Sequence, residues 1–257
     1  MNPKGNIFLA LGKRDVGKTY TTMEMAQRAQ DRGKVQKSLL VYDHTNNSSY
    51  NQYDLTPVTI EQVMYELPYL RKPFRCIIHY DDIDHFCEVV NLYLSLCCIV
   101  FDDCGVLFRG NLTIPKEKLL KTPKNNGTEL FFQAHRLNEI SPSLLAAANM
   151  YIIKQTVEDF DKLPPKVICR RELKYLLEQC VEENARRPAK EKWATRVYDT
   201  EEDEVWIPKV VHGQEDFEII SGEDYFPFSP KRQMQLKTLH ELKARIQQQT
   251  RKSYQHD

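Results

Sequence analysis

The sequence lacks the features that mark membrane-spanning, secreted or zinc-binding chains. No run of about 18 or more apolar residues occurs, so no transmembrane helix is expected. No C-x-x-C pair occurs among the seven cysteines, so the common cysteine type of zinc site is not expected either. The first residues, Met-Asn-Pro-Lys-Gly, do not resemble a signal peptide. The odd number of cysteines favours free thiols in a reducing compartment, and we expect a cytoplasmic protein.

An excess of charge of one sign is also lacking. The chain has 36 basic and 36 acidic residues and a formal net charge of +0, so nothing in the overall charge indicates nucleic acid binding. Any surface for nucleic acid must therefore be local. What the chain does have is length and apolar content. Its 257 residues, 41% of them hydrophobic, are enough for a sizeable core with or without an appendage.

The most informative segment that is present fits the phosphate-binding pattern G-x-x-x-x-G-K-[ST]. Its residues are Gly12, Lys13, Arg14, Asp15, Val16, Gly17, Lys18 and Thr19. The apolar run Asn6–Leu11 precedes it and a stretch without Gly or Pro follows it, so we expect a strand, this loop (the P-loop) and then a helix. Backbone N–H groups and the helix N-terminus would then face one anion. The pattern predicts that Lys18 reaches the β- and γ-phosphates of ATP and that the Thr19 hydroxyl ligates Mg²⁺.

Short apolar runs alternate with helical stretches up to about residue 157, which predicts parallel strands joined by crossover helices. The expected strands are Ile7–Leu11, Ser38–Tyr42, Cys76–His79, Cys97–Phe101, Leu130–Gln133 and Met150–Lys154. The expected helices are Thr19–Arg32, Ile60–Leu67, Asp84–Leu94 and Ser141–Ala148. We therefore predict an α/β fold with a mostly parallel central sheet flanked by helices, of the RecA-like P-loop NTPase kind.

The character of the sequence changes after Val157, where Pro164-Pro165 interrupts it. We expect a P-loop ATPase core over residues 1–157 and a C-terminal α+β appendage over residues 158–257. Within the appendage, Glu172–Asn184 is expected to be a helix.

Hydrolysis of a nucleotide also requires carboxylates opposite the P-loop. The apolar run Cys97–Phe101 ends in Asp102 and Asp103, which a parallel sheet would place at its carboxyl edge, where α/β folds bind ligands. We predict that Asp102 holds Mg²⁺ through water and that Asp103 activates the attacking water. The segment Tyr80-Asp81-Asp82, which follows an earlier strand, is a rival metal site.

The run Leu130–Gln133 leads into a second set of polar residues. In a parallel sheet Gln133 falls at the same edge as the two acids, where its amide can hydrogen-bond both the γ-phosphate and the attacking water. His135 is expected to act as a structural hydrogen-bonding residue. Arg136 is a candidate arginine finger that completes the site of a neighbouring subunit, and Arg109 is a comparable candidate. For either arginine the alternative is an ordinary surface ion pair.

Two segments carry local positive charge. Gly110–Thr128 contains prolines, Asn-Asn-Gly and several lysines, and predicts an exposed, mobile insertion. Its lysines are Lys116, Lys118, Lys121 and Lys124. They either follow the phosphates of DNA in a central pore or only make the loop soluble. Beyond Pro230, apolar residues spaced by three and four predict a basic amphipathic helix, which packs on the protein or contacts nucleic acid.

In order and spacing, these motifs resemble those of the HerA–FtsK superfamily of P-loop ATPases. The resemblance spans residues 5 to about 157. It is carried by Gly12–Thr19, Asp102-Asp103, Gln133-x-x-Arg136 and the run Leu39–Asp43, which is followed by the aromatic Tyr50. The segment from Phe132 to Pro142 is similar to that of compact viral members. These members include genome-packaging ATPases and zonular-occludens-toxin-like assembly ATPases of filamentous phages.

The resemblance implies a homo-oligomeric ring, often hexameric, that couples ATP hydrolysis to the movement of DNA. Two differences stand out: Asp103 occupies a position where Glu is common, and the membrane segment frequent in the zonular-occludens-like group is missing. We therefore predict an ATP-hydrolysing motor, viral or from a mobile element, that translocates or packages DNA in the host cytoplasm or the virion. One alternative is a small-molecule phosphotransferase, similar to a nucleoside kinase, with Arg170-Arg171 or Arg186-Arg187 as its lid. The other is a nucleotide-gated assembly scaffold that hydrolyses slowly.

Overall fold

The computed structural model describes residues 4–31, 35–157, 159–162, 167, 169–188, 191, 193–211, 214–231 and 233–234. The chain divides into two compact units, Met1–Thr200 and Glu201–Asp257. The first unit contains the P-loop.

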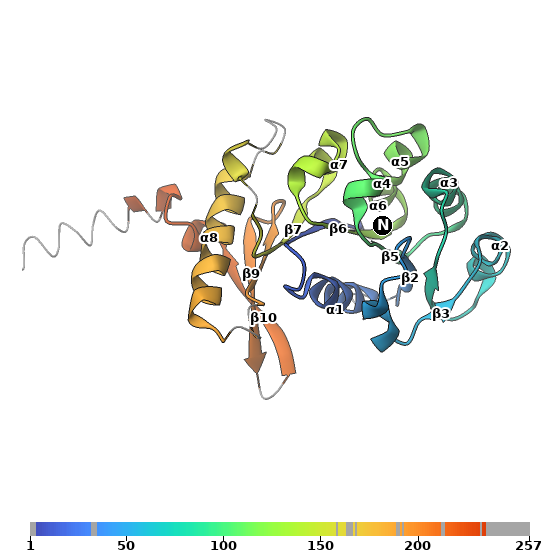
Figure 1. The fold of residues 1–257 in the computed structure, drawn as a ribbon, viewed down its shortest axis with the longest axis horizontal. Coiled ribbons are helices and arrows are strands. Elements are labelled where there is room, and N and C mark those ends of the chain that lie inside the picture. Colours follow the sequence, from blue (N-terminus) through green and yellow to red (C-terminus); the bar gives the residue numbers. More distant parts are fainter. Residues whose placement is uncertain are drawn as a thin grey trace, which may run out of the picture. The chain divides into compact units, whose positions relative to one another are not determined.

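A single sheet forms the centre of the first unit (Figure 1). Its strands are β1 (Ile7–Leu11), β2 (Ser38–Tyr42), β3 (Thr56–Pro57), β4 (Arg75–Ile78), β5 (Cys97–Phe101), β6 (Glu129–Ala134), β7 (Met150–Lys154) and β8 (Thr195–Asp199). Within this unit the neighbours follow the order β8-β7-β1-β6-β5-β2-β4-β3. All of these pairs are parallel except β7 with β8, which is antiparallel. The P-loop strand β1 therefore lies inside the sheet, between β6 and β7.

Helices cover both faces of this sheet, with α1 on one side and α4, α5 and α7 on the other (Figure 1). The helices of the unit are α1 (Lys18–Asp31), α2 (Ile60–Tyr65), α3 (Ile83–Tyr93), α4 (Cys104–Leu107), α5 (Ile114–Leu119), α6 (Thr122–Asn126), α7 (Pro142–Ala147) and α8 (Arg170–Arg186). Short 3₁₀ turns are η1 (Ser48–Gln52), η2 (Leu67–Tyr69), η3 (Leu137–Glu139) and η4 (Phe160–Lys162). Because neither face meets solvent, β1, β5, β6 and β7 are buried along their whole length.

Aromatic rings fix β5 against β6 close to their carboxyl ends. Phe101 and Phe132 stack with their ring centroids 4.9 Å apart, and Phe108 packs edge-on against both at 5.3 and 4.9 Å. All three rings are fully buried. Such contacts add to the stability that apolar burial already provides. They hold the residues that follow Phe101 and Phe132 in a fixed relation to each other.

The predicted α/β fold with a mostly parallel sheet is confirmed. The strands expected at Ile7–Leu11, Ser38–Tyr42, Cys97–Phe101 and Met150–Lys154 have those bounds, and the other two differ by one residue at each end. The division of the chain differs from the expected boundary at residue 157. The first unit continues to Thr200, because β8 pairs with β7 and α8 packs beside them.

The segment Gly110–Thr128 is not the exposed, mobile insertion that the sequence predicts. It folds into α5 and α6, and Leu119, Leu120 and Pro123 bury their side chains. The Lys116 ammonium pairs with Asp84 at 3.1 Å and lies over the Phe108 ring. Lys118, Lys121 and Lys124 remain exposed on the helical surface. The prolines that suggested a loop stand in the first turns of the two helices, where a missing N–H costs nothing.

The second unit contains an antiparallel hairpin of β9 (Glu204–Val211) and β10 (Gln214–Ser221), followed by the short helix α9 (Gly222–Tyr225). The α+β appendage predicted over residues 158–257 corresponds only in part to this unit, because α8 and β8 belong to the first unit. The basic amphipathic helix predicted beyond Pro230 lies almost entirely outside the described residues.

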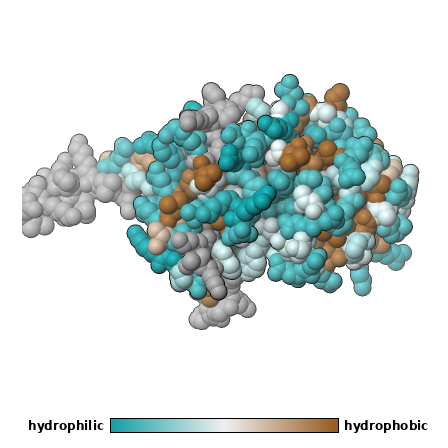
Figure 2. Space-filling view, in the orientation of Figure 1, coloured by the Kyte–Doolittle hydropathy of each residue, from teal (hydrophilic) through white to brown (hydrophobic). Residues whose placement is uncertain are grey.

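The surface is largely polar (Figure 2) and the cysteines are unpaired. Figure 2 shows a largely hydrophilic face on which hydrophobic residues form separate patches. No helix in the described part of the chain is long and apolar enough to cross a membrane. Every cysteine is a free thiol and all but Cys169 are buried.

A buried ion pair at the amino ends of β2 and β6 offers a test of this packing. Lys37 Nζ lies 2.5 Å from Glu129 Oε1, both side chains are nearly inaccessible, and Glu129 Oε2 also accepts the Asn6 N–H. Lys37→Met leaves an unpaired buried carboxylate and should lower the free energy of unfolding by about 3–5 kcal/mol. Urea unfolding of the first unit measures this.

The double variant Lys37→Met/Glu129→Gln removes the unpaired charge but keeps an acceptor for Asn6, so it should recover part of the lost stability. The variant Lys174→Met is the control for loss of a lysine from an ion pair. Lys174 pairs with Asp161 on the exposed surface, so its variant should unfold like the wild type. Equal effects of Lys37→Met and Lys174→Met would contradict the packing described for the sheet.

Candidate functional site

The P-loop leaves β1 at Leu11 and closes onto the first turn of α1, which begins at Lys18. Two of its residues, Asp15 and Gly17, have positive φ angles of 60° and 73°. A Cβ on Gly12 would lie 2.9 Å from Val16 Cγ2 and 3.0 Å from Lys154 Cβ, so a side chain there would force the loop open. The glycine positions of the pattern are therefore required by the close packing of the loop.

Lys18 folds back over the loop. Its Nζ donates to the carbonyl of Gly12 at 2.8 Å and lies 3.1 Å from His135 Nδ1. Burial lowers the pKa of the Lys18 ammonium to about 8, although the Asp102 and Asp103 carboxylates act in the opposite direction. A partly desolvated cation at this position attracts the phosphates of a nucleotide more strongly than a lysine in water would.

Asp102 follows β5 directly and its carboxylate is held by the loop after β2. Asp102 Oδ2 accepts a hydrogen bond from Asn47 Nδ2 at 3.1 Å and lies 3.3 Å from Thr45 Oγ1, whose one proton also reaches Asp43 Oδ1 at 3.0 Å. That loop is itself tied down by Asp43, whose carboxylate accepts from the backbone N–H groups of Thr45 and Asn47. Burial raises the pKa of Asp102, and the Asp43 and Asp103 charges add to the effect. A cation beside this carboxylate would stabilise its ionised form.

Asp103 stands at the N-cap of α4 with a left-handed backbone, φ 43°. The left-handed backbone ends β5 and begins α4, so Asp102 and Asp103 differ in backbone conformation. Both carboxylates act on Lys18 electrostatically, and both line the same cleft. Left-handed backbone in a non-glycine residue is uncommon and is often found at functional sites.

Gln133 connects the P-loop to η1. Thr19 Oγ1 donates to Gln133 Oε1 at 3.2 Å, and Gln133 Nε2 donates to the Tyr50 hydroxyl at 2.9 Å. Gln133 and Tyr50 are both buried. Burial, with the Asp102 and Asp43 charges, raises the pKa of Tyr50 well above its usual value, so the phenol stays protonated. The amide of Gln133 is thus engaged at both its oxygen and its nitrogen.

One cleft brings most of the predicted residues together at the carboxyl edge of the sheet. It is lined by Lys13, Arg14, Asp15, Gly17, Lys18, Thr19, Asp102, Asp103 and Gln133 from the predicted set. Further lining residues are Tyr20, Thr45, Asn47, Ser49, Gln52, Ala134, His135 and Trp193. Gly12 and Val16 are buried within the loop and shape it from below.

Arg136 and Arg109 do not line this cleft; both are exposed at the surface. An arginine that acts on the site of another subunit would need such exposure, so both remain candidates. None of the arginines proposed as a lid, Arg170-Arg171 and Arg186-Arg187, lines the cleft either.

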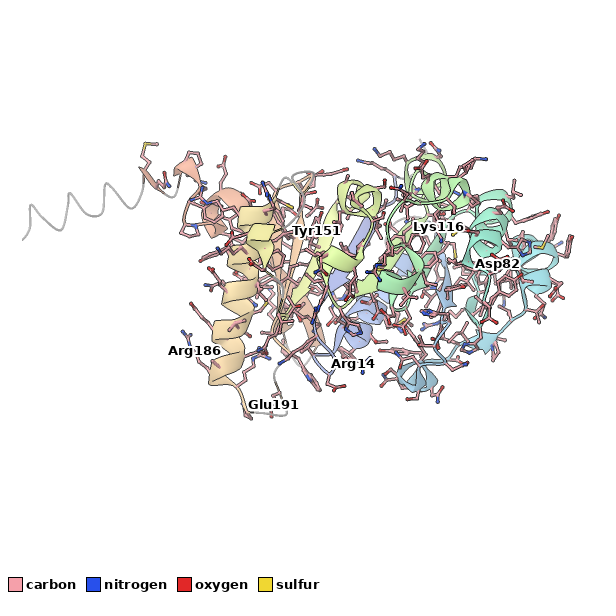
Figure 3. All side chains as sticks on the ribbon, turned by 45° about the horizontal axis from the view of Figure 1, so that its top comes forward. Arg14, Asp82, Lys116, Tyr151, Arg186 and Glu191 are labelled. Atoms are coloured by element: carbon pink, nitrogen blue, oxygen red, sulfur yellow. The ribbon has the colours of Figure 1, made fainter. Side chains whose placement is uncertain are left out.

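The rival acidic segment Tyr80-Asp81-Asp82 is away from the P-loop. In Figure 3 the label of Asp82 lies far from that of Arg14 on the P-loop. Asp82 caps α3, accepting hydrogen bonds from the N–H groups of Asp84 and His85. The strand before it, β4, is separated from β5 by β2. The carboxylate that shares a cleft with the P-loop is therefore that of Asp102.

The sequence reasoning missed two residues beside the P-loop, Lys154 and Trp193. Lys154 is a charged residue at the end of the apolar strand β7. A charge in such a buried run is unusual, and this feature of the sequence could have identified it. Its side chain is almost fully buried, and burial lowers the pKa of its ammonium to about 8. Trp193 belongs to no pattern in the sequence, and only the pairing of β8 with β7 places it here.

Oxygen ligands dominate the chemistry of this site. The described residues include no cluster of three or more His, Cys, Asp or Glu side chains that could hold a metal ion by itself. The Thr19 hydroxyl and the Asp102 carboxylate lie in one cleft with an anion-binding loop. This set suits Mg²⁺, which takes few protein oxygens and completes its shell with water and phosphate. The residues present thus fit a magnesium–nucleotide complex.

Comparison with solved structures gives matches to the same fold. The genome packaging NTPase B204 of Sulfolobus turreted icosahedral virus 2, in complex with ATP-gammaS, matches 81% of this chain and 98% of its own at a TM-score of 0.56 and 16% identity. The DNA-packaging ATPase B204 of Sulfolobus Turreted Icosahedral Virus matches 82% of this chain and 100% of its own at a TM-score of 0.52 and 17% identity. At this level of identity the likeness establishes the fold that the motifs predicted.

Other comparisons add little. The N-terminal domain of zonular occludens toxin from Neisseria meningitidis matches 58% of this chain at a TM-score of 0.33, too low to carry weight. No protein-family model and no curated protein sequence matches the chain.

The buried lysines allow a test of the site's electrostatics. In the folded chain Lys18 and Lys154 should each release a proton near pH 8, against 10.5 in the unfolded chain. Between these two values the unfolded chain binds more protons, so both lysines make folding more favourable as the pH rises through that window. Lysine Cε resonances followed by NMR should show two groups titrating near pH 8, and these should vanish one each in Lys18→Met and Lys154→Met. Titration of both at the ordinary lysine value would contradict the burial described here.

Proposed function

We propose that this chain is an ATP-hydrolysing motor that packages or translocates DNA, in a virus or a mobile element. The observation that carries the proposal is the convergence of the P-loop lysine, the Asp102-Asp103 pair and Gln133 on one cleft. The fold that holds this cleft is that of solved proteins described as genome packaging NTPases. The phosphotransferase alternative gains no comparable observation, since the arginines proposed as its lid do not line the cleft.

In this proposal the triphosphate of ATP lies on the backbone N–H groups of Gly12–Thr19, with the Lys18 ammonium on the β- and γ-phosphates. Two of the similar solved structures contain the ATP analogues ATP-gammaS and AMPPCP, which supports a nucleotide ligand. Thr19 and Asp102 would hold Mg²⁺, which supplies positive charge to the phosphate oxygens when bound. Asn47 and Thr45 orient the Asp102 carboxylate for this role.

Asp103 is the proposed general base. Its carboxylate takes a proton from water as the water oxygen attacks the γ-phosphorus, and the bond to the β,γ-bridging oxygen breaks, so that ADP leaves. Gln133 orients that water and senses the γ-phosphate. Because its amide also contacts Thr19 and Tyr50, a change at the phosphate reaches η1 through two hydrogen bonds.

The proposed assembly is a homo-oligomeric ring in which Arg136 or Arg109 of one subunit reaches the site of the next. The exposed position of both residues is compatible with this role. Lys118, Lys121 and Lys124 on α5 and α6 and their connecting turns are the proposed contacts to DNA phosphates. Lys116 is left out of this set because it is paired with Asp84.

Two variants separate binding from chemistry. Lys18→Ala removes the cation from the P-loop and should lower both ATP affinity and turnover, the turnover by about 100-fold or more. Asp103→Asn keeps the size of the side chain but cannot accept the proton, so kcat should fall by about 100-fold or more while ATP binding persists. Calorimetry with ATP and a phosphate-release assay measure the two effects. Exposed Lys72→Ala is the control. Turnover by Lys18→Ala at the control's rate would refute the ATPase proposal.

Neutralising the exposed lysines of α5 and α6 tests whether they contact DNA. The triple variant Lys118→Gln/Lys121→Gln/Lys124→Gln should lose most of the stimulation of ATPase activity by DNA, because three phosphate contacts disappear. Its rate without DNA should equal that of the matched triple variant Lys72→Gln/Lys174→Gln/Lys209→Gln, which changes net charge equally at other exposed positions. The measurement is phosphate release with and without duplex DNA at two salt concentrations. Stimulation equal in the two triple variants would exclude α5 and α6 as the DNA contact.

A further inference from the structure

An exposed indole stands beside the P-loop without a role in the proposed hydrolysis. Trp193 lines the same cleft as Lys13, Arg14 and Gly17, and it is 55% exposed. Its Cγ lies 3.7 Å from the position that a Cβ on Gly17 would occupy, so the ring packs directly over the loop. In Figure 3, Glu191 just before it and Arg14 on the P-loop both lie toward the lower edge of the view.

Hydrogen bonds hold the backbone next to this tryptophan in place. The N–H of Ala194 donates to Asn184 Oδ1 at the end of α8, and Asn184 Nδ2 donates to Gln155 Oε1. The carbonyl of Gln155 in turn accepts the N–H of Lys13, the second residue of the P-loop. The backbone next to Trp193 is thus connected to the P-loop by three hydrogen bonds in sequence.

The buried Lys154 ammonium also holds the backbone at Trp193 in place. Its Nζ donates to Thr195 Oγ1 at 2.7 Å, and Thr195 Oγ1 donates to the carbonyl of Trp193 at 2.9 Å. A nearly inaccessible ammonium is costly to bury unless it is fully hydrogen-bonded. Here its bonds serve to position one short stretch of backbone, from which the Trp193 ring projects into the cleft.

The sheet order indicates what this ring can meet. Gln133 lies near the end of β6 and the Asp102-Asp103 pair follows β5, and both strands lie on one side of β1. Trp193 precedes β8, which with β7 lies on the other side. In the proposed function the γ-phosphate points toward Gln133, and we take the base to extend the other way along the P-loop. That direction leads to Trp193.

We propose that Trp193 is the stacking surface for the base of the bound nucleotide. This inference rests on the proposed function, because it assumes that ATP occupies the P-loop. Stacking on a flat ring depends on the area of the base and not on its hydrogen-bonding edge. The site should therefore accept ATP and GTP with similar affinity and bind CTP and UTP less tightly.

Intrinsic fluorescence provides the first test. The chain has two tryptophans, so Trp206→Phe leaves Trp193 as the sole indole. In that background ATP and GTP should quench the emission, because a base stacks on the ring. Inorganic tripolyphosphate, which has no base, should bind without quenching. Calorimetry measures the affinity of each ligand independently of the fluorescence.

Substitution provides the second test. Trp193→Ala should weaken ATP binding by about 5- to 100-fold and leave tripolyphosphate binding unchanged, whereas Trp193→Phe should keep most of the ATP affinity. Trp206→Ala is the matched control for loss of an indole. Circular dichroism and thermal unfolding of each variant establish that it is folded.

The outcomes separate this inference from the proposed function. Tight ATP binding that neither quenches Trp193 nor weakens in Trp193→Ala would overturn the stacking role. Equal weakening of ATP and tripolyphosphate in Trp193→Ala would also overturn it, because the indole would then only support the loop. Failure of the folded wild type to bind either ligand would refute the nucleotide site itself.

Discussion

The parallel pairing of β1 with β6, and of β6 with β5, is the constraint on which the site depends. In this register Leu11 lies opposite Ala134 and Phe101 lies opposite Phe132, so the three strands end within a few residues of one another. The P-loop, Gln133 and the two aspartates are consequently delivered to one edge of the sheet, where Thr19 and Gln133 also hydrogen-bond each other. The stacked rings of Phe101 and Phe132 keep this alignment fixed.

The site itself combines residues that attract phosphate with residues that position Asp102 and Gln133. Lys18 and the loop amides belong to the first group, and Asp43, Asn47 and Tyr50 belong to the second. The second group comes from the loop after β2 and from η1, so this part of the chain is as important for the geometry as the P-loop. Asp102 in particular owes its orientation to hydrogen bonds from that loop.

Those parts of the structure that follow from local pattern were predictable from the sequence. Apolar runs fixed the strand bounds, and polar residues at the ends of Cys97–Phe101 and of β6 identified Asp102 and Gln133. Predictions failed where the outcome depends on packing. Proline is common both in loops and in the first turn of a helix, so the prolines of α5 and α6 do not distinguish the two. Only the burial of Leu119 and its neighbours decides for the helices. β8 has no continuous apolar run, so neither its pairing with β7 nor the position of Trp193 could be foreseen.

The double engagement of Gln133 has a consequence for how this chain can vary. Its oxygen must accept from Thr19 while its nitrogen donates to Tyr50. Ionised glutamate has no N–H to donate, so it could keep a bond to Tyr50 only by accepting the phenol proton, and asparagine is one methylene shorter than glutamine. The side chain at position 133 is therefore constrained by two residues that lie 114 and 83 positions away in the sequence.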